Sequence, residues 1–418
     1  MKLSKYYFEK FFDNQKFLIS VIIIISLIVR IPVIHFYGDN RLDHEWLVIV
    51  NNLINHNEFA FRNFENFYVP NLYMPPLYAW FIYIFKLLNL NDANSLTLIL
   101  YVQAVLASIS MVAFYFICKR FFTNNLSLIL TTLFCFWPSY LYACGQISSI
   151  TLYIFLIILF LYFILNISSR ANYKYSVYLG IVSGLSILLR GEFILIFIFS
   201  LIYLFIFYKN VNFKKIILTL LVTFMVLSPY LYRNITELST FSITKSIGFN
   251  LWKGNNPYSN VEGDLKNRLV DEHGPRSFDE KMENKINDIQ IDKYYDINLD
   301  NFFLQEALKN IQNEPERYIK LYIKKFISFL FIDLNSSFKN YYHPLHVIPL
   351  IIISVTSLIG AILVIKDSKT LNLISILYLF YIFIFSFFFI LPRYNLIILP
   401  MQILLTGKLI KKLYNKFI

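Results

Sequence analysis

Residues 371–391 read LNLISILYLFYIFIFSFFFIL, a run without a single charged side chain. A bilayer with a hydrocarbon core about 30 Å thick is crossed by roughly 20 apolar residues in a helix. The run therefore predicts a membrane-spanning helix. Apolar runs also occupy residues 17–29 and 96–118. The chain is expected to be an integral membrane protein.

The composition of the 418 residues agrees with this expectation. Hydrophobic residues make up 57% and charged residues only 15%, with a mean hydropathy of +0.56. Soluble domains carry roughly 25% charged residues. The net charge of +12 does not point to nucleic acid, because the cations lie at the ends of the apolar runs.

Basic residues fill alternate connections between the apolar runs, as in Lys119-Arg120 and Lys214-Lys215, and also the C-terminal segment from Lys408 to Lys416. The positive-inside rule places these clusters in the cytoplasm. We therefore expect a multi-pass protein of the cell inner (plasma) membrane with both termini cytoplasmic. The expected spans are 17–37, 96–118, 125–143, 147–166, 177–189, 193–208, 215–232, 346–365, 371–391 and 394–412.

Two further apolar stretches, 77–90 and 321–334, fall below the usual spanning length of about 17 residues. We interpret both as helices at the outer membrane interface, with two additional spans as the alternative. The predicted fold is an all-α polytopic membrane protein with about ten transmembrane helices, ten to twelve in all.

Three regions follow from this topology. Residues 1–232 form an N-terminal transmembrane module with a first outer loop at 38–90. Residues 233–320 form an extracytoplasmic region between spans 7 and 8, and residues 321–418 hold the C-terminal interfacial and transmembrane helices. Within the second region, Gly254-Asn255-Asn256-Pro257 predicts turns, and apolar residues from Phe302 to Tyr322 recur at intervals near 3.6, which predicts one amphipathic helix.

Several short motifs follow one another along the chain. They are Leu42-Asp43-His44-Glu45-Trp46, the Pro-Pro-Leu-Tyr turn at 75–78, GIVSGLSILLR at 180–190, Arg233-Asn234, GFNLWKGNNP at 248–257, Glu306-Ala307-Leu308 with NEPERY at 313–318, and Arg393-Tyr394 with Pro400. In this order the motifs resemble the C-type membrane glycosyltransferases. That superfamily includes protein O-mannosyltransferases and bacterial lipid A aminoarabinose transferases.

The resemblance implies transfer of a sugar from a polyprenyl-phosphate donor to a lipid, glycan or protein acceptor on the extracytoplasmic face. Such an inverting reaction needs a carboxylate base and cations that stabilise the departing lipid phosphate. A flippase for lipid-linked glycans and a polymerase of the O-antigen type are the alternatives. The chain lacks the repeated halves that are common in transporters.

Asp43 is the residue that the resemblance marks as catalytic base, with Asp39 and Glu45 as the other candidates in the first outer loop. The competing interpretation of Asp43 is an N-cap for the helix that starts near Glu45, since Asp is a favoured capping residue.

Arg233, Arg393, Arg190 and Lys253 are the candidates for the donor phosphate, because a guanidinium holds phosphate oxygens in a bidentate manner. Each of the three arginines has a simpler interpretation. Arg393 and Arg233 could anchor span ends at the headgroups, and Arg190 could form a local ion pair with Glu192.

No metal site is predicted. His343 and His346 are a weak pair, and His44 between two acids adds little to them. Ile150 stands where many relatives have an acid, and Met74 stands where some have lysine before the Pro-Pro turn. The resemblance leaves a divalent cation open and implies no other cofactor. Membrane lipids are the remaining expected partner.

Overall fold

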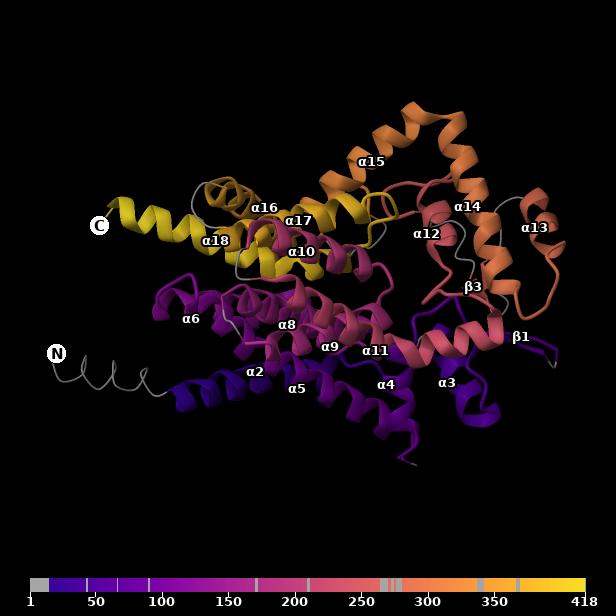
Figure 1. Ribbon diagram of the computed structural model, residues 1–418, viewed down its shortest axis with the longest axis horizontal. Coiled ribbons are helices and arrows are strands. Elements are labelled where there is room, and N and C mark those ends of the chain that lie inside the picture. The colour runs from indigo at the N-terminus through magenta and orange to yellow at the C-terminus, as the bar shows by residue number, and fades with distance from the viewer. Residues whose placement is uncertain are drawn as a thin grey trace.

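The computed structural model describes residues 15–42, 44–65, 67–88, 91–169, 172–208, 211–263, 270–271, 274–275, 280–336, 342–365 and 369–417. Figure 1 shows a bundle of long helices with a smaller outer region at one end, built from α3, α12, α13, α14 and the strand β1. The first turn of α2 and the last turn of α18 both lie at the opposite end of the bundle.

The described elements follow one another along the chain as helices with two short hairpins. They are α2 (Gln15–Tyr37), α3 (His44–His56), β1 (Ala60–Phe64), β2 (Phe67–Pro70), α4 (Pro76–Lys86), α5 (Asp92–Lys119), α6 (Asn124–Cys135), α7 (Pro138–Cys144), α8 (Ser149–Ser169), α9 (Lys174–Leu189), α10 (Phe193–Phe207), α11 (Phe213–Leu238), α12 (Ile247–Gly254), β3 (Val270–Asp271), β4 (Gly274–Pro275), α13 (Glu280–Asn287), α14 (Tyr295–Asn313), α15 (Pro315–Leu330), α16 (Pro344–Val364), α17 (Lys369–Phe385), the 3₁₀ turn η2 (Pro392–Tyr394) and α18 (Asn395–Phe417).

The chain is a multi-pass, mostly helical membrane protein. Among the described residues, α2, α5, α8, α11 and α16 are long and apolar enough to cross a membrane. The bent pair α6 and α7 passes the same test as one unit, and α9, α10 and α17 are shorter apolar helices. Each of the ten expected spans overlaps with one helix or with this bent pair, but the helix in the expected span 371–391 ends at Phe385, so the prediction of one helix over the whole run was wrong at its C-terminal end. The count of ten spans stays a prediction.

The expected span 125–143 is not straight. α6 ends at Cys135, α7 starts at Pro138, and the two helices are bent by 57°. Trp137 has an extended backbone, with φ −65° and ψ 117°. The ring of Pro138 disfavours helical geometry in the residue before it, which explains the bend.

Glycine sets the distance between α9 and α11. A Cβ atom added at Gly180 would lie 2.8 Å from the carbonyl oxygen of Thr219, and one at Gly184 would lie 2.6 Å from Cβ of Val226. The Thr223 hydroxyl also donates to the Gly180 carbonyl at 3.2 Å. Small residues four apart allow membrane helices to approach this closely.

The outer region differs from the expected all-α fold in two places. β1 and β2 pair antiparallel across a turn in which Glu65 has a positive φ of 52°, and β3 pairs with β4. The amphipathic helix expected from Phe302 to Tyr322 is instead two helices, because α14 ends at Asn313 and α15 starts at Pro315. Pro315 has no N–H for the helix to continue through, so the prediction of one helix was wrong.

The two short apolar stretches are the helices α4 and α15. α15 covers Pro315–Leu330, so the stretch expected at 321–334 is a helix that starts earlier and ends earlier. Ile319, Ile323 and Ile327 are each at least half exposed on it. Neither α4 nor α15 is among the described helices long enough to cross a membrane, but neither are α9, α10 and α17. The interfacial position of α4 and α15 therefore stays a prediction.

Candidate active site

Helix α12, which carries most of the GFNLWKGNNP motif, is held at both ends by buried charges. The Asp300 carboxylate of α14 accepts the backbone N–H of Phe249 at 3.0 Å. At the other end the Lys325 ammonium of α15 donates to the Gly254 carbonyl at 2.7 Å and to the Asn255 side chain at 3.1 Å. An anion at the N-terminus and a cation at the C-terminus both suit the helix dipole.

The two buried charges titrate away from their usual values. Burial raises the pKa of the Asp300 carboxyl, and the N–H groups of Phe249 and Gly248 oppose this rise. Burial lowers the pKa of Lys325 to about 7. Desolvation disfavours the charged form of each group. The hydrogen bonds of Asp300 and Lys325 to α12 therefore form at an electrostatic cost.

A second buried contact fixes the turn that precedes α4. Asp296 of α14 pairs with Arg62 of β1, and both side chains are almost completely buried. The same carboxylate accepts the backbone N–H groups of Leu72 and Tyr73, at 3.0 and 3.2 Å. Helix α14 thereby positions both α12 and the Tyr73 turn.

Tyr394 lies next to two of the predicted phosphate ligands, because the guanidinium carbon of Arg190 is 5.6 Å from its ring centre and Arg393 precedes it in the chain. Four charged side chains act electrostatically on its phenol, namely Arg393, Arg190, Glu192 and Glu45. They come from η2, the turn between α9 and α10, and the first turn of α3. One predicted acid and two predicted phosphate ligands therefore share one neighbourhood.

Arg190 is held by aromatic rings on both sides. Its guanidinium carbon lies 5.1 Å from the ring centre of Tyr153 and 5.6 Å from that of Tyr394. The Glu192 carboxylate is 3.4 Å away, and the Arg190 side chain is 16% exposed. The local ion pair anticipated from the sequence exists. The distance of 3.4 Å between the Arg190 nitrogen and the Glu192 oxygen is long for a charged hydrogen bond, so the guanidinium keeps capacity for a further anion.

Lys253 reaches the same neighbourhood through Phe389. Its ammonium lies 4.6 Å from the centre of the Phe389 ring, and that ring lies 6.2 Å from the ring of Tyr394. A Cβ atom added at Gly254 would lie 2.7 Å from the backbone of Phe388. The close approach of α12 to this loop therefore requires glycine at position 254.

The three candidate acids differ in their surroundings. The Asp39 carboxylate accepts the backbone N–H of Ile147 at 2.8 Å, in the loop between α7 and α8. The negative charge of Glu45 acts on the phenols of both Tyr73 and Tyr394. Asp43 lies outside the described residues, so its role stays a prediction.

Arg233 lies among different partners. It donates to the Asn71 carbonyl at 3.0 Å, forms an ion pair with Glu237 at 2.6 Å and stacks over Phe59. These contacts tie the outer end of α11 to the segment just before Tyr73. Its predicted contact with phosphate has no support from this geometry.

No group of three metal-binding side chains occurs in the part of the chain that the structure describes. The His343 ring accepts the backbone N–H of Leu345 at 3.3 Å and caps α16. This contact gives it a structural role at a helix N-terminus.

The sequence analysis assigned no role to Tyr394 or to the hydrogen-bonded pair Tyr153 and Tyr381. The hydroxyls of Tyr153 and Tyr381 lie 2.8 Å apart and join α8 to α17 next to Arg190. With 31 tyrosines in the chain, only the position of Tyr394 beside Arg393 could have singled it out.

Comparisons with known proteins identify part of the chain by sequence and the rest by fold. Residues 73–232 match the profile of a family described as dolichyl-phosphate-mannose-protein mannosyltransferase. No curated protein matches the chain.

Solved structures extend the likeness to nearly the whole chain. The oligosaccharyltransferase of Archaeoglobus fulgidus in its apo form superposes with a TM-score of 0.55 and 13% identity, over 96% of this chain and 51% of that one. Its complex with Zn and sulfate gives 0.54 and 12%, over 95% and 49%. ArnT from Cupriavidus metallidurans bound to undecaprenyl phosphate gives 0.45 and 11%, over 96% and 79%.

The chain spans about half the length of the archaeal structures, and at these identities the likeness shows the fold alone. The matched family and the solved neighbours are glycosyltransferases. Residues 73–232 are therefore similar in sequence to the dolichyl-phosphate-mannose-protein mannosyltransferase family, and the chain shares its fold with the archaeal oligosaccharyltransferase, as the predicted resemblance to C-type membrane glycosyltransferases led us to expect.

Proposed function

We propose that the protein transfers a sugar from a polyprenyl-phosphate donor to an acceptor hydroxyl or amide on the extracytoplasmic face of the inner membrane. The observation that carries this proposal is the position of Arg190, whose guanidinium carbon lies 5.6 Å from the ring of Tyr394, the residue that follows Arg393 in the chain. Glu45 of the first outer loop acts electrostatically on the same phenol. A carboxylate beside guanidinium groups is what the reaction requires. The name of the matched family includes dolichyl phosphate mannose, a sugar on a polyprenyl-type phosphate, and this supports a donor of the same chemistry.

The proposed step is an inverting displacement at the anomeric carbon. A carboxylate of the first outer loop, Asp43 with Asp39 or Glu45 as alternatives, accepts the proton of the acceptor. The acceptor atom forms its bond to the anomeric carbon as the bond from that carbon to the phosphate oxygen breaks. The lipid phosphate leaves with the bonding electrons. General base catalysis of this kind contributes roughly 10²- to 10⁴-fold.

Arg393, Arg190 and Lys253 are the proposed ligands of the departing phosphate. Arg393 is exposed, while Arg190 is fixed between two rings and Lys253 lies over Phe389. Fixed cations stabilise a developing anion without reorganising during the reaction. Arg233 is the weakest of the four candidates because Asn71 and Glu237 already occupy it.

The proposed orientation keeps both termini in the cytoplasm and the cluster around Tyr394 outside. The basic connections Lys119-Arg120 and Lys214-Lys215 support this orientation through the positive-inside rule. The outer region lies at one end of the bundle, and the first turn of α2 and the last turn of α18 lie at the opposite end (Figure 1).

The choice of donor gives a first test. Purified protein in liposomes should transfer a radiolabelled sugar from a polyprenyl phosphate and not from a nucleotide sugar, because nucleotide sugars are confined to the cytoplasm. Efficient transfer from the nucleotide sugar, with no response to the lipid donor, would contradict the proposal. A flippase would move the labelled lipid across the bilayer and leave its sugar bond intact.

The phosphate ligands give a second test. Arg190→Gln and Arg393→Gln should each weaken the binding of polyprenyl phosphate by roughly 10- to 100-fold, the range that corresponds to a charge-assisted hydrogen bond of about 1.5 to 3 kcal/mol. Binding to purified protein is measured by calorimetry, with thermal stability in parallel.

Arg120→Gln is the matched control, because Arg120 lies at the far end of α5 and donates to the Leu165 carbonyl. Wild-type affinity in both Arg190→Gln and Arg393→Gln would remove these two residues from the phosphate site. Arg233→Gln should mainly lower stability, since its partners are protein groups.

A further inference from the structure

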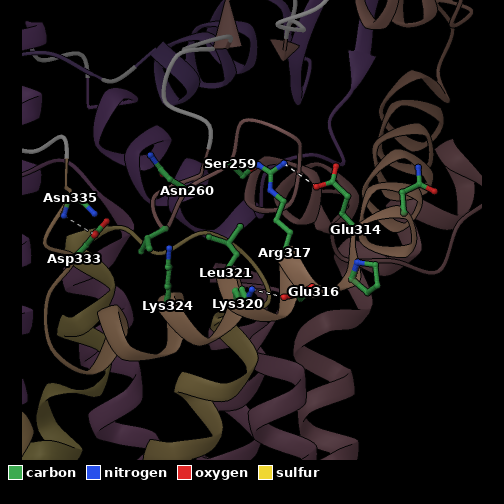
Figure 2. Close-up of a pocket in the computed structure, with 13 residues that line it drawn as sticks. Ser259, Asn260, Glu314, Glu316, Arg317, Lys320, Leu321, Lys324, Asp333 and Asn335 are labelled. Carbon is green, nitrogen blue, oxygen red and sulfur yellow. Dashed lines mark hydrogen bonds and ion pairs between the residues drawn. The ribbon is translucent and has the colours of Figure 1, made fainter.

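A cavity of about 810 Å³ lies along α15, between this helix and the turn 259–261 that follows α12. Figure 2 shows its walls: one face of α15 with Arg317 and Lys324, the corner between α14 and α15, the turn 259–261, and Asp333 with Asn335 in the loop after α15. Sites for small molecules usually enclose roughly 300 to 1,000 Å³. The cavity is large enough for a ligand of that class.

The charges that line the cavity nearly cancel. Arg317 faces Glu314 at 3.6 Å, and Lys320 pairs with Glu316 at 2.5 Å. Lys324 has no ion-pair partner among the described residues, and Figure 2 shows its side chain directed into the cavity. A polyanion such as nucleic acid is bound by many uncompensated cations, which this lining lacks.

The other polar groups suit hydroxyls. Asn260, Asn313 and Asn335 bring three amides to the lining, and Ser259 and Asp333 are close to them. An amide can donate and accept at once, as a hydroxyl can. The Asn260 oxygen already accepts the backbone N–H of Glu262 at 3.0 Å, so this residue offers its NH₂ group to a ligand. Leu321 and Val261 add an apolar part to the wall. Such a mixture matches a sugar ring, which has hydroxyls at its edge and C–H groups on its faces.

The cavity shares a wall with the proposed active site. The Ser259 hydroxyl donates to the Lys253 carbonyl at 2.9 Å, and the backbone N–H of Ile390 donates to the Val261 carbonyl at 2.8 Å. Lys253 and the Phe389 ring lie on the other side of this turn. Hydrogen bonds thus join the turn that lines the cavity to Lys253, one of the proposed phosphate ligands, and to Ile390 next to Phe389.

We propose that this cavity binds a saccharide part of the acceptor, so that the acceptor of the reaction is a glycan and not a protein. The inference rests on the proposed function and adds the acceptor class to it. The exposed Ile319, Ile323 and Ile327 lie on the same helix as Lys324. We expect these exposed isoleucines to contact lipid, which would bring the cavity within reach of a glycan on a lipid anchor.

The acceptor class is tested with an envelope extract of the source organism divided into glycolipid, free glycan and protein fractions. Each fraction is incubated with the wild-type protein and a labelled polyprenyl-phosphate sugar. Label in the glycolipid or free glycan fraction is expected. Label confined to protein would overturn the inference and leave the proposed function standing. Absence of label from all three fractions, with intact donor, would overturn the proposed function itself.

Binding in the cavity is tested without turnover. Lys324 is exposed, so a lysine-reactive ester should modify it, and the free glycan fraction should reduce that modification several-fold. Lys309 of α14 is the matched control, because it is exposed but does not line the cavity. Equal modification of Lys324 with and without glycan would overturn the inference.

Variants complete the test. Asn260→Ala and Lys324→Ala should each raise the KM for the labelled glycan acceptor about tenfold and leave the KM for the donor unchanged, whereas Lys309→Ala should change neither. Thermal stability shows whether each variant is folded. Folded Asn260→Ala and Lys324→Ala with an unchanged acceptor KM would place the acceptor elsewhere.

Discussion

Asp43→Asn is expected to lower sugar transfer per folded molecule by roughly 10²- to 10⁴-fold, the contribution of a positioned general base. Asparagine keeps the size of the side chain but cannot accept the proton of the acceptor. Donor binding should change little, because the proposed phosphate ligands come from other segments. The measurement is a transfer assay in liposomes, with the folded fraction determined for each variant.

Asp39→Asn and Glu45→Gln complete the series. Asp39 accepts the backbone N–H of Ile147, so its substitution should disturb the join between α2 and the loop before α8 and lower stability first. Glu45 acts on Tyr73 and Tyr394, so Glu45→Gln is the variant most able to share the loss of turnover. The control is Asp92→Asn, since Asp92 is 91% exposed and pairs only with Lys86 in the described structure.

The outcomes separate the interpretations of Asp43. Asparagine caps helices as well as aspartate, so normal transfer by a folded Asp43→Asn protein of unchanged stability, with a loss of about 0.5 to 2 kcal/mol in Asp43→Ala, would identify Asp43 as a helix cap. The base would then be Asp39 or Glu45. Normal transfer by all three variants would remove the first outer loop from the mechanism.

The apolar runs were sufficient to predict the membrane class because spanning length is a property of one segment. Each expected span overlaps with a helix or a bent pair, but some ends moved, as at Pro138, where proline bends the chain, and at Phe385, where α17 ends before the apolar run does. The split at Pro315 and the β1–β2 hairpin were missed. Apolar periodicity does not reveal the N–H group that a proline lacks, and the hairpin from Ala60 to Pro70 is too short to carry a strong strand pattern.

The site was predicted only as a set of residue types. Sequence could propose Glu45, Arg190 and Arg393 one at a time, but their convergence on Tyr394 depends on how α3, the α9–α10 turn and η2 pack together. Arg233 looked equivalent to the other arginines. Its partners Asn71 and Glu237 show that it has a different environment, and no motif contains that information.

The buried contact between Arg62 and Asp296 should dominate the stability of the outer region. Both side chains are almost fully buried, and the rings of Tyr73 and Tyr295 surround the guanidinium at 5.0 and 5.7 Å. Removing one member of a buried ion pair leaves the other charge without compensation, which costs about 3 to 5 kcal/mol. Arg62→Met and Asp296→Leu should each lower the free energy of unfolding by that amount.

A double-mutant cycle separates the pair from its surroundings. Arg62→Met with Asp296→Leu should cost clearly less than the sum of the two single variants, because no uncompensated charge remains. It should still be destabilised, since the N–H groups of Leu72 and Tyr73 lose their acceptor. Unfolding is followed by denaturant titration in detergent micelles.

The exposed pair Lys86 and Asp92 is the matched control for this cycle. Its two charged atoms lie 2.6 Å apart, but Asp92 is exposed to solvent. Exposed pairs contribute only about 0 to 1 kcal/mol, so Lys86→Met should have a small effect. If Arg62→Met were as mild as Lys86→Met, α14 would not depend on this contact, and the Tyr73 turn would have to be held by Asn71 and Arg233 instead.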